Sequence, residues 1–297
     1  MPALAAASLF PASAFAAATK GAGASAPLTV KDVSGLTVIG GAGCNVVALA
    51  GPDGALLIDG GRAVDAARTL KAVTDTLKAA RVATLINTHW HPEQVGLNEA
   101  VGKAGGTIVS HEVTRLYLGR DSHSALYPGI IKALPPAARP TKTTFDTGSL
   151  EFAGETVAYR YLPAAHTNGD LFVHFPKRNV IVAGGPVSAV RWPVLDYQNG
   201  AFMHGFVRSY EILAQVVKPD TIVIPADGPT LTGADIVKQK DMYWALFKQF
   251  FADFNKGFGP KDIVEAHPLK DYEAQYGDPA QFLEAAYRSL QLATVPH

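Results

Sequence analysis

Residues 88–94 read Thr-His-Trp-His-Pro-Glu-Gln, and the fold can be worked out from this stretch. It follows an apolar run, Val82–Asn87, that predicts a buried strand. In extended backbone, residues two apart point to the same side, so His89 and His91 can face one point. Two imidazoles with a carboxylate nearby, that of Glu93, are typical of half of a metal site. Taken alone, the motif is equally compatible with two histidines in a surface loop.

A third histidine supports the metal interpretation. His166 also follows a strand-like run, Thr156–Leu162, and it precedes an Asn-Gly turn. A third imidazole at another strand end would complete a tripod and leave one tetrahedral position open for water. The chain has a single cysteine, Cys44, so any metal ion must be held through nitrogen and oxygen atoms.

Strands and helices are mixed within two similar halves of the chain. Each half combines hairpins with strand–helix–strand units, which favours two sheets packed face to face with helices outside over a doubly wound parallel sheet. The expected strands are 35–39, 45–50, 55–59, 82–87, 107–110, 143–145, 150–152, 156–162, 171–175, 180–183 and 221–224. The expected helices are 63–80, 93–103, one with Ser110 as its N-cap, 203–217, 233–256 and 279–292.

The amino-terminal segment has the composition of an export signal. Residues 1–18 carry no charge, and Ala14-Phe15-Ala16 forms an A-x-A cleavage pattern. We interpret residues 1–16 as the remnant of a signal peptide that lacks its basic region, followed by a flexible lead at 17–34. The protein would then be periplasmic or secreted. A disordered alanine-rich leader is the alternative, and the apolar stretch is too short for a stable membrane anchor.

The charge balance limits the classes of partner. Lys plus Arg equals Asp plus Glu at 26 each, so no basic face for nucleic acid is expected. A small-molecule substrate is the expected partner. A homo-oligomer is compatible with the sequence, because the aromatic residues of 233–254 suit either core packing or a face between subunits. Trp192 and Tyr197 are expected to line a cleft.

Five segments resemble the metallo-β-lactamase superfamily. THWHPEQVG at 88–96 resembles that family's T-H-x-H-x-D-H-x-G signature, and AAHTNGD at 164–170 is similar to its G-H-T-x-G-D segment. LLIDGG at 56–61 resembles a strand end with V-D-T-G. VIVAGG at 180–185 stands where the family has a strand ending in Gly-Asp, and VIPADGP at 223–229 where it has V-P-G-H-G-P.

The resemblance implies a fold and a first set of site residues. The expected fold is an αβ/βα sandwich of four layers with its core at 35–230 and a helical extension at 231–297. The implied metal ligands are His89, His91 and His166. Residues expected to support these ligands or to line the pocket are Asp59, Gln94, Asp170, Gly185 and Asp196.

The second metal site of the family is degraded in this sequence. The family's water-orienting Asp is Glu93 here, and its neighbouring His is Gln94. Its bridging Asp is Gly185, and its last His is Asp227. Two cations about 3.5–4 Å apart repel strongly without a bridging carboxylate, so one zinc ion per chain is expected. Glu93 and Asp227 are then the expected catalytic acids and bases, although with Gln94 they could instead bind a hard cation weakly.

Three functions from different classes remain open. The first is an exported zinc hydrolase of a small ester, thioester, lactone or amide, which uses the three-histidine site to activate water. The second is a pseudoenzyme that keeps the fold as a module for binding metal or ligand. The third, an iron oxygenase, ranks last because the carboxylate it needs is replaced by Gly185.

Overall fold

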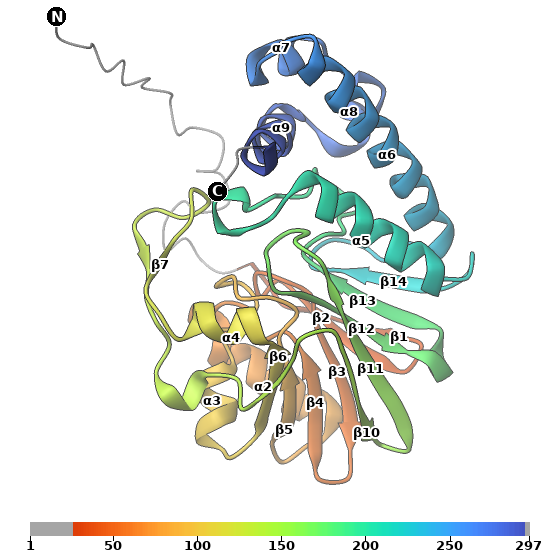
Figure 1. Cartoon of the computed structure of the whole chain (residues 1–297). Coiled ribbons are helices and arrows are strands. Elements are labelled where there is room, and N and C mark those ends of the chain that lie inside the picture. The colour runs from red at the N-terminus through yellow and green to blue at the C-terminus, as the bar shows by residue number, and fades with distance from the viewer. Residues whose placement is uncertain (1–25, 295–297) are drawn as a thin grey trace, which may run out of the picture.

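Two sheets lie face to face and carry helices on their outer sides (Figure 1). The computed structural model describes residues 26–294, with side chains as far as residue 290. The expected signal-peptide remnant at 1–16 lies outside this range. No helix within the described range is both long and apolar enough to cross a membrane.

The first sheet has seven strands and the second has six. In the first sheet the strand order is β1 (Thr29–Val33), β2 (Leu36–Gly40), β3 (Val46–Gly51), β4 (Gly54–Ile58), β5 (Val82–Ile86), β6 (Thr107–His111) and β9 (Lys142–Thr144). In the second it is β10 (Thr147–Phe152), β11 (Glu155–Leu162), β12 (Asp170–Phe175), β13 (Val180–Gly184), β14 (Ile222–Pro225) and β15 (Leu231–Thr232). A separate hairpin joins β7 (Ser122–His123) to β8 (Ile130–Ile131).

The helices cover the outer faces of both sheets. Those of the first half are α2 (Ala66–Leu77), α3 (Asn98–Lys103) and α4 (Glu112–Leu118). Those of the second half are α5 (Met203–Val216), α6 (Gly233–Asn255), α7 (Pro260–Glu265), α8 (Glu273–Tyr276) and α9 (Ala280–Thr294). Short 3₁₀ turns are η1 (Ala63–Asp65), η2 (Pro136–Ala138), η3 (Pro176–Arg178), η4 (Tyr197–Asn199) and η5 (Lys270–Tyr272).

Three apolar clusters hold the layers together. The central cluster fills the space between the sheets, where Val47 and Ile58 of the first sheet meet Val173 and Val182 of the second. An outer cluster packs α2 and α3 on the first sheet, and a larger one packs α5, α6 and α9 on the second. The resulting order is helices, sheet, sheet, helices. The expected αβ/βα sandwich with a carboxyl-terminal helical region is confirmed.

The strand directions bring the functional loops to one edge. β4, β5, β6 and β9 run parallel to one another, so the loops after β4 and β5 leave the sheet on the same side. Asn45 joins this edge to the second half, since its side-chain amide donates to the carbonyl oxygens of Pro225 and Gly228, each at 3.0 Å. Its backbone N–H donates to Ala226 O at 2.6 Å.

Three details differ from the sequence-based expectation. Thr29–Val33, expected in the flexible lead, forms β1 and pairs antiparallel with β2. The helix expected at 93–103 begins only at Asn98, because the preceding turn packs against the loop after β4: Gly60 N donates to Gln94 O, and Gly96 N to Gly61 O. The N-cap of α4 is His111 rather than Ser110, and its Nδ1 accepts from the N–H of Val113 at 3.2 Å.

Candidate metal centre

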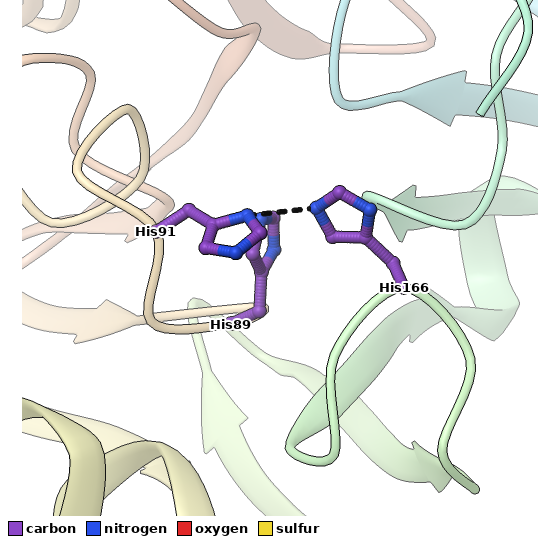
Figure 2. A group of neighbouring side chains, drawn as sticks. All are labelled: His89, His91 and His166. Carbon is purple, nitrogen blue, oxygen red and sulfur yellow. Dashed lines mark hydrogen bonds between the residues drawn. The ribbon is translucent and has the colours of Figure 1, made fainter. Parts of the chain in front are cut away.

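Three buried imidazoles converge where loops of the two halves meet (Figure 2). His89 and His91 follow β5, and His166 lies on the turn between β11 and β12. The ring centroids are 4.6–5.0 Å apart in all three pairs, and the rings are nearly perpendicular to one another. One ring nitrogen from each histidine lies within 4.8 Å of the other two. The three histidines predicted from the sequence therefore form one cluster.

Hydrogen bonds behind each ring fix which nitrogen faces the centre. Nδ1 of His166 lies 2.6 Å from the carbonyl oxygen of Val194 and must donate to it, because a carbonyl oxygen only accepts. Nε2 of His91 lies 3.2 Å from the carboxylate of Asp196 and donates in the same way. Nε2 of His166 and Nδ1 of His91 then face each other 2.9 Å apart, the contact that is dashed in Figure 2, and in neutral rings of these tautomers both atoms carry lone pairs.

The third ring follows the same pattern through a hydroxyl group. Thr88 Oγ1 donates to Asp59 at 2.7 Å, so it accepts from Nδ1 of His89 at 3.0 Å. This leaves the lone pair on Nε2 of His89, a buried atom with no hydrogen-bond partner among the described residues. Support of a ligating histidine through its second nitrogen is the usual arrangement in metal sites.

The protonated forms of His89 and His166 are disfavoured. Burial lowers the pKa of His89 well below its ordinary value, and the neighbouring His166 and His91 lower it further. Burial and the neighbouring His91 likewise lower the pKa of His166 to about 3. Neutral imidazoles with convergent lone pairs repel one another unless a cation lies between them. Tetrahedral zinc separates its ligand nitrogens by about 3.3 Å, so this donor set fits such an ion.

Two buried aspartates hold the loops that carry the ligands. Asp59 accepts from both the N–H and the hydroxyl of Thr88 at 2.7 Å, and it does so in a left-handed conformation with φ of 60°. Asp170 accepts from the backbone N–H groups of His166 and Thr167 at 2.8 Å. Burial raises the pKa of each carboxyl to about 7. A nearby metal cation would favour their ionised forms.

The cluster opens into a cavity of about 230 Å³ lined by several of the predicted residues. Glu93 lies in its wall, where the hydroxyl of Tyr127 donates to the Glu93 carboxylate at 2.7 Å. Burial and the charge of Glu93 raise the pKa of Tyr127, so this hydroxyl keeps its proton. Gln94 also lines the cavity and has a buried Oε1 without a partner among the described residues.

Asp227 reaches the same cavity but is paired with a cation. The guanidinium of Arg191 forms an ion pair with its carboxylate, and both side chains line the cavity. Arg191 follows β13 by seven residues and Asp227 follows β14 by two. The positively charged guanidinium of Arg191 therefore lies beside Asp227, one of the two predicted catalytic residues.

The comparisons with known proteins agree with this geometry. The family model of the metallo-beta-lactamase superfamily matches residues 39–227, well over half of the chain. The chain belongs to the metallo-β-lactamase superfamily. The expected family is thus confirmed, and the three histidines form the metal-binding cluster of this family member.

Solved structures show the same fold at low sequence identity. A metallo-beta-lactamase from Pontibacter korlensis is 20% identical, with a TM-score of 0.56, over 73% of this chain and 93% of that one. The metallo-beta-lactamase DIM-1 is 15% identical, with a TM-score of 0.58, over 74% and 99%. The stereoselective inverting sec-alkylsulfatase Pisa1 from Pseudomonas sp. is 15% identical, with a TM-score of 0.63, over 87% of this chain and 49% of that one. No curated protein matches the sequence.

Gly185 explains how this superfamily member differs at the second metal position. A Cβ atom at residue 185 would lie 2.2 Å from Cδ2 of His166 and 2.8 Å from its Nε2. The imidazole of His166 thus occupies the space that any side chain at residue 185 would need. Together with the Arg191–Asp227 ion pair, this contact leaves a three-histidine cluster beside a pocket lined in part by polar side chains.

Sequence analysis missed four groups of this site. Thr88 and the carbonyl of Val194 orient histidine rings, while Tyr127 and Arg191 hold the two acidic side chains. Thr88 is the first residue of the quoted motif, so its role could have been predicted from its place beside His89. The other three lie in irregular loops far away in sequence, and no periodicity or motif marks them. Asp196, which was predicted, contacts His91 directly.

The contact at residue 185 gives a test of the centre. Gly185→Ala should displace the imidazole of His166 and lower the metal affinity by about 10- to 100-fold, the usual effect of disturbing the support of a ligand. Competition with a chromophoric chelator measures the affinity. Gly119→Ala is the matched control, since its Cβ would meet its nearest atom only at 3.4 Å. Equal affinity of Gly185→Ala and the wild type would show that His166 does not depend on this space.

Proposed function

We propose that the protein is an exported, zinc-dependent hydrolase of a small ester, thioester, lactone or amide, with a single metal ion held by His89, His91 and His166. The observation that carries the proposal is the convergence of three buried imidazoles, with one ring nitrogen of each within 4.8 Å of the other two. Zinc on three neutral imidazoles lowers the pKa of a water molecule towards neutrality, which is the chemistry it would supply here.

The chain's own residues supply the remaining functions of a hydrolase. Glu93 would take the proton from the attacking water, and the hydrogen bond from Tyr127 holds its carboxylate in one orientation. The guanidinium of Arg191 would offset the negative charge that develops on the substrate's carbonyl oxygen, while Asp227 fixes that guanidinium in place. The cavity of about 230 Å³ suits the reacting portion of a small molecule.

The proposed zinc content can be measured directly. Protein purified without added metal should carry one equivalent of zinc, because Gly185 provides no bridging carboxylate and leaves no room for one. His166→Ala should reduce this to less than about 0.1 equivalent, since it removes one of three ligands. His204→Ala changes an exposed histidine outside the cluster and should leave the metal content unchanged. Two tightly bound equivalents in the wild type would contradict the single site.

The role of Glu93 has its own test. Glu93→Gln keeps the shape and removes the charge, so zinc should stay bound while hydrolysis falls by roughly 10²–10⁴-fold, the usual contribution of a general base. Glu99→Gln on α3 is the matched control, because Glu99 is exposed. The panel should contain esters, thioesters, lactones and β-lactams. If the zinc-loaded wild type turns over none of them, the pseudoenzyme alternative replaces the hydrolase.

Export rests on the uncharged apolar leader and its Ala14-Phe15-Ala16 pattern. We expect the mature chain to begin near Ala17 and to be recovered outside the cytoplasm. Amino-terminal sequencing of protein from a periplasmic or culture fraction is the measurement. Because the basic region of a signal peptide is missing before the apolar run, the test should include a version with a basic extension before Met1. An uncleaved leader on extracytoplasmic protein would contradict the proposed cleavage.

A further inference from the structure

A second cavity adjoins the metal centre and is twice as large. Its volume is about 460 Å³, compared with about 230 Å³ for the metal cavity. One wall is the loop Arg191–Gln198, and the other comes from the helical extension, with Tyr276, Phe282 and Ala285. The extension lies beyond residue 227, where the superfamily match ends. One wall of the second cavity therefore lies within the matched range and the other lies beyond it.

The two cavities share part of their lining. Leu126 and the residues Arg191–Val194 line both of them. The same loop also supports the metal cluster, because Val194 accepts from His166 and Asp196, which lines the second cavity, accepts from His91. A molecule that reaches from one cavity into the other would thus pass along the segment that orients two of the three imidazoles.

The shared wall and the far side of the second cavity are rich in aromatic residues. Trp192 is stacked on Phe282 with ring centroids 5.7 Å apart, and it lies 4.9 Å from Tyr276. Its indole N–H already donates to the carbonyl oxygen of Gly277 at 2.7 Å. The tryptophan therefore has no donor left for a ligand and can offer only apolar contact.

Charged residues in the second cavity are largely paired within the protein. Glu284 and Arg288 form an ion pair on α9 at 2.8 Å. The carboxylate of Asp196 accepts from His91 and from the side chain of Asn199. Groups satisfied in this way gain little from a polar ligand, whereas the aromatic wall gains from any apolar one. The volume also falls within the range of about 300–1,000 Å³ that is typical of ligand pockets.

We propose that the second cavity binds an apolar arm of the substrate, an alkyl or aryl chain of about six carbons, while the scissile carbonyl group lies at the three histidines. This inference rests on the proposed function and narrows its substrate class to hydrophobic esters and thioesters. Arg191 lines both cavities. In the proposed binding mode its guanidinium would lie beside the carbonyl group of the substrate and not at the far end of the substrate's apolar arm.

A pair of thiols tests the arm without relying on turnover. Thiolates bind zinc, so ethanethiol and hexanethiol share one anchor and differ only in chain length. Each methylene moved from water into an apolar site raises affinity by about fourfold. Calorimetric titration of the zinc-loaded protein should therefore show hexanethiol binding more tightly by on the order of 10²-fold. Hexanol, which lacks the anchor, serves as the control for non-specific binding.

Ala285→Phe places an aromatic ring in the second cavity from α9. It should reduce the affinity ratio of hexanethiol to ethanethiol to less than about tenfold. Ala274→Phe is the matched control, because Ala274 is exposed and does not line the cavity. If Ala285→Phe does not fold, Gln281→Trp fills the cavity from an exposed position of the same helix. For the wild type, kcat/KM should be higher with p-nitrophenyl hexanoate than with p-nitrophenyl acetate. In Ala285→Phe and Gln281→Trp this difference should disappear.

The outcomes separate this inference from the proposed function. If ethanethiol binds and hexanethiol binds no more tightly, the arm site is refuted and the metal centre stands. If the affinity ratio of hexanethiol to ethanethiol is unchanged in Ala285→Phe and in Gln281→Trp, the arm site is also refuted. If neither thiol binds the zinc-loaded protein, the metal centre itself is wrong, and the arm site falls with it. If hexanethiol binds about 10²-fold more tightly than ethanethiol, and only Ala285→Phe and Gln281→Trp abolish this difference, both the arm site and the metal centre are supported.

Discussion

The mutual repulsion of three buried lone pairs is the constraint on which the rest of the site depends. His91 and His166 face each other at 2.9 Å and their other nitrogens donate to Asp196 and to Val194, so neutral rings in these tautomers present lone pairs to each other. Burial and the neighbouring His91 depress the pKa of His166 to about 3, so that ring does not readily hold a second proton near neutral pH. The surrounding fold must hold the rings together against this repulsion, and a bound cation converts it into attraction.

Both halves of the sandwich contribute to that restraint. In the first half, Asp59 leaves β4 in a left-handed conformation and fixes Thr88, which in turn orients His89. In the second half, Asp170 at the start of β12 accepts from the backbone of the turn that carries His166. Each aspartate is buried and each acts through backbone and hydroxyl groups, not by touching the metal position. The strain and desolvation are tolerated because the apolar clusters between the four layers over-determine the position of both loops.

The residues at the positions of the family's second metal site have partners within the protein. Arg191 neutralises Asp227, Tyr127 holds Glu93, and the ring of His166 fills the space beside Gly185. A fixed guanidinium charge can stabilise a developing oxyanion without the exchange of water that a loosely held cation would require. The same loop borders the aromatic cavity built with the helical extension, so the metal cavity and the adjoining cavity share one short segment, Arg191–Val194.

The sequence by itself determined the family, the sandwich and the three metal-binding histidines. The family followed from the resemblance of five short segments to its motifs, whereas the two packed sheets followed from the mixture of hairpins with strand–helix–strand units, and the histidine pair from a His-x-His spacing that depends only on the period of an extended strand. The tertiary structure alone decided the partners of those residues. Residue 93 lies in a turn and not in a helix, because Gly60 and Gly61 bind the 94–96 backbone from a distant loop. Likewise, the pairing of Asp227 with Arg191 and the contact of Gly185 with His166 join segments that no local pattern connects, so only the tertiary packing of loops within the second half could fix them.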